Sequence, residues 1–84
     1  MDSRVVSLGR EAMRLSTDPA WIATIRQAEA VIVAEWTQTN PSEAGRREAL
    51  HAEWRALQRV ITALQTLIAN GEDEQNSVMR RVMR

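Results

Sequence analysis

The stretch LHAEWRALQRVITALQTLIANG, residues 50–71, decides the fold of this chain. Its large apolar side chains recur at alternating steps of four and three residues, which is the spacing of one face of an amphipathic helix. These side chains are Leu50, Trp54, Leu57, Ile61, Leu64 and Ile68. Asn70-Gly71 follows, and this pair predicts that the helix ends with Gly71 in the left-handed conformation. The stretch predicts a helix and carries no catalytic motif.

A helix of similar length is predicted before this stretch. Asp18 is a suitable N-cap, and Pro19 fits the first helical position, where its missing N–H costs nothing. We expect this helix to run to about Thr39. Its central stripe is Trp21, Ile25, Ala28, Ile32 and Trp36.

Asn40-Pro41 marks the break between the two long helices. Asn40 can cap the next helix, and Glu43 can reach back to it as the partner in a capping box. We therefore expect the next helix to span residues 41–70, although Gly45 weakens its first turn and allows a start near Arg46.

The two long helices, residues 19–39 and 41–70, are predicted to form an antiparallel hairpin, because the connection between them is short. In the expected register Trp36 lies opposite Leu50, and Ile32 lies opposite Trp54. The predicted hairpin core consists of Trp21, Ile25, Ile32, Trp36, Leu50, Trp54, Leu57, Ile61, Leu64 and Ile68.

Both ends of the chain are expected to add short helices to the hairpin segment 18–71. Residues 1–16 form the first, capped by Asp2 or Ser3, and Gly9 on its apolar face allows another backbone to come close. Residues 72–84 form either a short amphipathic helix or a frayed polar tail. The whole chain, 1–84, is thus predicted to be one all-α domain.

The helix over 41–70 carries a second apolar stripe, about 100° around from the first. No other part of the 84-residue chain is assured to cover this stripe. Together with the apolar residues of the C-terminal segment, it is the predicted interface with other copies or with a partner. The predicted interface residues are Ala49, Ala56, Val60, Ala63, Leu67, Val78, Met79, Val82 and Met83.

The length and composition of the chain favour its association with other protein chains. A chain of 84 residues has a marginal core of its own, and without cysteine it has no disulfide to reinforce it. We therefore expect a homo-oligomer that also docks on a larger protein. The formal net charge is zero, so neither nucleic acid nor membrane is an expected partner. The N-terminus lacks a signal-peptide pattern, which predicts a cytoplasmic protein.

No residue is predicted to be catalytic, to bind a cofactor or to bind a metal. The single histidine, His51, has charged helical neighbours, as a surface histidine does. One alternative stays open, because Glu48 and His51 form a Glu-x-x-His pattern. With Glu35 nearby, a dimer of hairpins would resemble the metal site of encapsulated ferritins.

Four short segments carry a resemblance to known proteins, namely residues 17–21 (TDPAW), 34–39 (AEWTQT), 47–51 (REALH) and 67–72 (LIANGE). In this order they resemble small all-α helical-hairpin proteins of tailed bacteriophages. The resemblance implies a non-enzymatic structural or assembly protein, found in the host cytoplasm or in the virion, whose partner is a capsid, portal or packaging protein. The alternative is a phage-encoded inhibitor or regulator that binds a host or defence protein.

Overall fold

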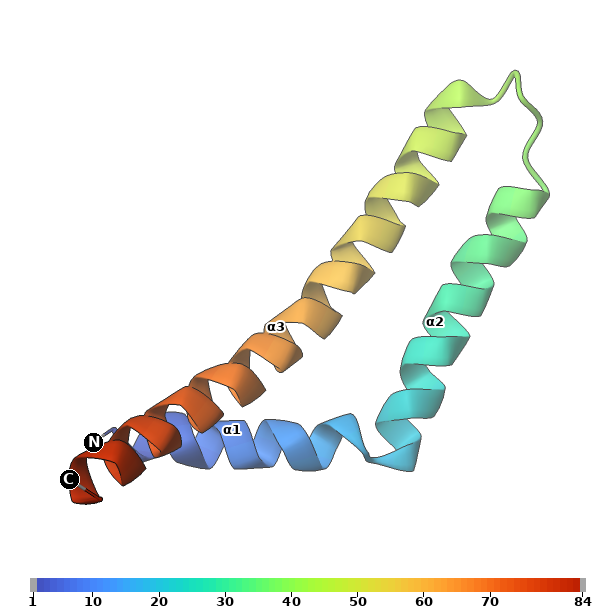
Figure 1. Ribbon diagram of the computed structural model, residues 1–84. Coiled ribbons are helices and arrows are strands. Elements are labelled where there is room, and N and C mark those ends of the chain that lie inside the picture. Colours follow the sequence, from blue (N-terminus) through green and yellow to red (C-terminus); the bar gives the residue numbers. More distant parts are fainter. Residues whose placement is uncertain (1, 84) are drawn as a thin grey trace.

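The computed structural model describes residues 2–83, and these residues form three helices and no strand. Helix α1 spans Ser3–Ser16, α2 spans Pro19–Thr37 and α3 spans Ala44–Val82. Figure 1 shows them as the three sides of a narrow triangle, with α1 joining the far ends of α2 and α3. The predicted all-α class is confirmed.

The first two helices begin where their capping residues predict. A side-chain oxygen of Asp2 accepts a hydrogen bond from the backbone N–H of Arg4 at 3.0 Å. The Oδ1 atom of Asp18 accepts from the N–H groups of Ala20 and Trp21 at 2.8 and 3.1 Å. Each cap satisfies N–H groups that have no partner inside the helix, which fixes the start of the helix.

The turn after α2 contains the expected contact, but α3 starts later than residue 41. The Glu43 carboxylate accepts a hydrogen bond from the backbone N–H of Asn40 at 3.0 Å. Residues 41 and 42 belong to the turn itself, and α3 begins at Ala44 with Glu43 as its N-cap residue. The first helical residue thus lies between the two predicted starts, at 41 and near Arg46.

Helix α3 does not end at Gly71, and the prediction that it does is wrong. The helix continues through Gly71 to Val82, so the segment after Gly71 is neither a separate helix nor a frayed tail. No glycine in residues 2–83 has a positive φ angle. The physical reason lies in the tertiary contact of Gly71, because the position is buried against α1.

Gly9 and Gly71 form the point where α1 crosses α3. A Cβ atom built on Gly9 would lie 2.8 Å from the Cα of Gly71 and 3.0 Å from the carbonyl oxygen of Leu67. A Cβ atom built on Gly71 would lie 2.9 Å from the Cα of Gly9. The expectation that Gly9 admits another backbone is confirmed. Val6 and Ala12, which lie on the same face of α1, are buried there as well.

The contact between α2 and α3 near the turn is built on Trp36 and Leu50. The Arg47 guanidinium lies 4.8 Å from the centre of the Trp36 ring, and Arg47 Nε donates to the Thr39 hydroxyl at 3.0 Å. Leu50 is only 4% exposed. Trp36 and Leu50 line one small apolar pocket together with Ile32 and Trp54, as the expected register requires.

The predicted hairpin is not confirmed as the principal packing unit. Helix α3 packs more extensively on α1 than on α2, and the α2 and α3 ribbons diverge away from the turn (Figure 1). Of the ten predicted core residues only Leu50 is buried. Trp36 and Trp54 are exposed, and the others are half-buried, namely Trp21, Ile25, Ile32, Leu57, Ile61, Leu64 and Ile68.

The chain is extended and has little interior. Its dimensions are 63 × 24 × 16 Å and its radius of gyration is 18.4 Å, against about 12 Å for a globular chain of this length. No side chain in residues 2–83 is fully buried. The accessible surface is 6508 Å², which exceeds by about 1,500 Å² the area usual for a folded monomer of this mass.

Candidate functional site

The second stripe of α3 has no cover within the chain. All five of its residues are exposed: Ala49, Ala56, Val60, Ala63 and Leu67. Val60 is 51% exposed and Leu67 is 41% exposed. Figure 1 shows a side of α3 with no other helix beside it. The stripe is exposed from Ala49 to Ala63, and at Leu67 it reaches the crossing of α1, where the Leu67 carbonyl oxygen lies beside Gly9.

The C-terminal residues of the predicted interface behave in two ways. Val78 is half-buried and lines a groove between α3 and α1, together with Val6 and Ser7. Met79, Val82 and Met83 remain exposed, and the last two are more than three-quarters exposed. At about 100° per residue these three side chains lie well around the helix from the Ala49–Leu67 stripe, so they form a separate exposed apolar patch at the end of α3.

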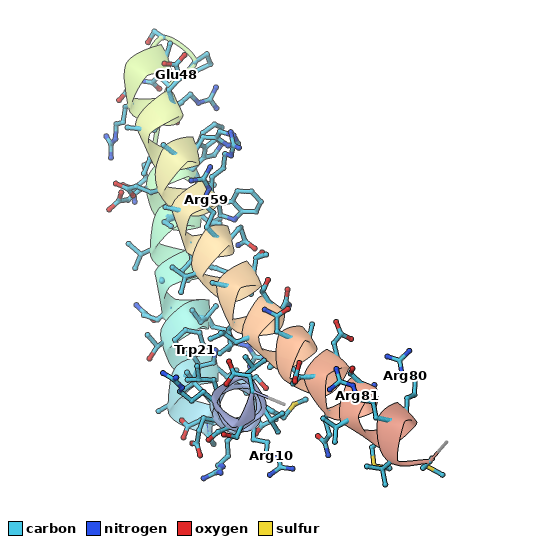
Figure 2. All side chains as sticks on the ribbon, turned by 90° about the vertical axis from the view of Figure 1, so that its left-hand side faces the viewer. Arg10, Trp21, Glu48, Arg59, Arg80 and Arg81 are labelled. Carbon is cyan, nitrogen blue, oxygen red and sulfur yellow. The ribbon has the colours of Figure 1, made fainter. Side chains whose placement is uncertain are left out.

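The outer face of α3, which points toward the viewer in Figure 2 with α2 behind it, is partly charged. Shallow hollows along the helix are lined by Arg47, His51, Arg55 and Arg59, which recur at steps of four residues. Ala52, Ala56 and Ala63 line the same hollows. Small side chains leave room for close approach of a helix, and the arginines can bind carboxylates.

The Glu-x-x-His pattern does not assemble a metal site within one chain. No group of three histidine or acidic residues that could hold a metal comes together in residues 2–83. Glu48 and His51 line the same hollow as Arg47, Arg55 and Arg59, whose positive charges oppose a cation there. His51 also stacks on Trp54, with the ring centres 6.3 Å apart.

Four exposed charged residues lie on the outer face of α3, and the sequence alone did not indicate that all four share it. They are Glu48, Arg55, Asp73 and Arg80. The ion pairs within residues 2–83 join Arg14 to Glu11 and Arg46 to Glu43, so none of these four belongs to an ion pair there. The signal was present in their helical spacing, but the predicted end at Gly71 placed them in different elements.

No helix within residues 2–83 is both long and apolar enough to cross a membrane. Comparison of the chain with models of known families, with curated proteins and with solved structures finds no match.

Proposed function

We propose that this chain is a non-enzymatic assembly protein that binds copies of itself and docks on a larger protein. The single observation that carries the proposal is the exposed stripe on α3, from Ala49 to Leu67, in a chain without one fully buried side chain among its described residues. Apolar surface of this extent costs free energy in water and is usually covered in the working state of a protein.

The surplus of accessible surface supports this proposal quantitatively. A stable interface between two proteins removes about 800 Å² of surface from each partner, and obligate interfaces remove more. The surplus of about 1,500 Å² on this chain is sufficient for one such interface. A larger protein partner would then bind the exposed end of α3, at Met79, Val82 and Met83.

The setting that we propose is the assembly of a tailed bacteriophage, by resemblance of the segments from residue 17 to residue 72. The partner would be a capsid, portal or packaging protein. A long, thin chain with exposed faces on one continuous helix suits a role that consists of holding other proteins together.

Light scattering on the purified chain tests the proposal. We expect one defined oligomer at micromolar concentration, and a stable monomer of 9.5 kDa would overturn self-association. Mass spectrometry of particles of the encoding phage tests the setting, because an assembly protein occurs in virions or in their precursors. Absence from both, with capture of a host protein instead, would favour the inhibitor alternative.

A further inference from the structure

We propose that the outer face of α3, from Glu48 to Arg80, binds the same face of a second copy in antiparallel orientation. The twofold axis crosses the helix at the level of Ala63 and Leu64, the middle of this segment. This inference rests on the proposed function, since it assigns a geometry to the self-association.

Opposite charges on the face favour this pairing. At about 100° per residue, Glu48, Arg55, Asp73 and Arg80 lie within about 40° of one another around the helix. The charges of these four alternate in sign along it, and a fifth charge on the face, Arg59, falls opposite Ala69 of the other copy. Antiparallel pairing about the level of Leu64 places Glu48 of one copy opposite Arg80 of the other, and Arg55 opposite Asp73. Parallel pairing in register would instead set this charged flank of each copy against the apolar flank of the other, so none of the four charges would meet an opposite charge of this set.

The apolar flank of the same face fits the same arrangement. Val60 and Leu67 lie at equal distances from a point between Ala63 and Leu64, half a residue from the midpoint of the charge pairs. In an antiparallel helix pair, the flank on one side of the seam meets the same flank of the other helix. Val60 of one copy therefore packs on Leu67 of the other in the arrangement that also joins the opposite charges.

The seam between the two flanks carries mostly short side chains. Ala52, Ala63, Thr66 and Asn70 lie on it and are exposed, and Arg59 is its one long side chain among residues 52–70. Short side chains at such a seam allow two helix axes to approach to about 8–10 Å. Figure 2 shows α3 in front of α2, with Glu48, Arg59 and Arg80 labelled along it.

The area and the net charge agree with a second copy as the occupant. One α3–α3 interface covers the stripe that the fold leaves exposed, and the surplus surface of about 1,500 Å² exceeds what a stable dimer needs from each partner. The formal net charge of zero means that two copies do not repel each other overall.

Charge reversal with mixing tests the pairing. Arg55→Asp places Asp opposite Asp73 twice in a homodimer, and Asp73→Arg places Arg opposite Arg55 twice. Each variant alone should raise the dimer dissociation constant by about tenfold or more in sedimentation velocity at low salt. In an equal mixture of the two variants both pairs are opposite in charge, so the dimer should return as a heterodimer.

The matched controls change the same charges elsewhere. Arg26→Asp lies on α2, and Glu72→Arg lies beside Asp73 but on another side of α3. Neither control should shift the dissociation constant by more than about twofold, and all variants should keep the helical circular dichroism signal, since these positions are exposed.

The outcomes separate this inference from the proposed function. A dimer that neither reversal weakens, or a mixture that does not restore it, overturns the antiparallel pairing and leaves self-association standing. A wild-type chain that stays monomeric at every concentration overturns both.

Discussion

Replacing Gly9 by alanine should push α1 slightly away from α3 and destabilise the chain. The added Cβ would lie 2.8 Å from the Cα of Gly71, whereas ordinary van der Waals contact begins at 3.4 Å. The three nearest atoms, from Gly71 and Leu67, are all backbone atoms, so no side chain can turn aside. The helix axes must move apart by several tenths of an ångström, and the surrounding contacts of Val6 and Ala12 loosen.

The magnitude follows from two opposing terms. Overpacking at a close contact costs about 1–3 kcal/mol. Alanine in place of glycine inside a helix returns about 1 kcal/mol, because alanine has the higher helix propensity. We therefore expect Gly9→Ala to lower the free energy of unfolding by up to about 2 kcal/mol.

Gly45→Ala is the matched control. A Cβ at Gly45 meets nothing within 4 Å, so only the propensity term acts and the free energy of unfolding should rise by up to about 1 kcal/mol. The third variant, Gly71→Ala, should resemble Gly9→Ala, since its Cβ would lie 2.9 Å from the Cα of Gly9. The two close-contact variants should not be additive, because either one already separates the helices.

Urea unfolding followed by circular dichroism, at one fixed chain concentration, measures these differences. If Gly9→Ala stabilised the chain as much as Gly45→Ala, the two glycines would not be in contact and the crossing of α1 on α3 would be wrong.

Three further perturbations test other parts of the structure. Leu50→Ala removes the most buried large side chain and should cost about 2–5 kcal/mol in the same unfolding assay, whereas a loss below about 1 kcal/mol would mean that Leu50 is not packed. Val60→Asp should abolish the oligomer in light scattering without loss of helix, unlike the control Gln65→Asp, and an unchanged oligomer would exclude the stripe as the interface. Deletion of residues 72–84 should lower the helical circular dichroism signal by more than the share of the deleted residues. The reason is that α1 loses the hydrogen bond from the Asp2 N–H to Glu74 at 3.0 Å and the groove that Val78 lines beside it. A decrease limited to the share of the deleted residues would show that α1 folds without them.

The features that the sequence predicted well are local. Asp2 and Asp18 cap helices through backbone groups two or three residues away, so the residues themselves specify the contact. The same holds for Glu43, whose carboxylate reaches back to Asn40. Capping needs no knowledge of the rest of the fold, and this is why these starts could be predicted.

The end of α3 was predicted at the wrong residue because it depends on a contact with a residue that is distant in the sequence. Asn70-Gly71 has the composition of a helix end, and only Gly9, far away along the chain, makes Gly71 a packing position. One signal was present: the apolar seam continues beyond Ile68 at helical spacing, through Gly71 to Val78 and Val82. A glycine on the buried face of a long periodic pattern indicates a close helix crossing as readily as a helix end.

The part of the candidate site that lies within one predicted helix could be predicted, because helical spacing alone defines it. The stripe from Ala49 to Leu67 lies within one predicted helix, and its residues are exposed although α1 reaches the backbone of the last one, Leu67. Asp73 and Arg80 share a face with Glu48 and Arg55 only because α3 is continuous. The predicted helix end at Gly71 therefore hid this part of the site.

The distance between spin labels on Asn76→Cys tests the central claim, that a second copy covers α3 in antiparallel orientation, most directly. The chain has no native cysteine, so one label per copy reports on the pair alone, and Asn76 is exposed. Residue 76 lies 12 residues from the level of the proposed axis at Leu64, so two copies place their labels about 36 Å apart along the helices and about 40 Å overall. Pulsed electron paramagnetic resonance should show one distance of about 40 Å for helices of this rise and spacing. A distance below about 20 Å, which the spacing of adjacent parallel helices gives, or no distance at all, would contradict the account.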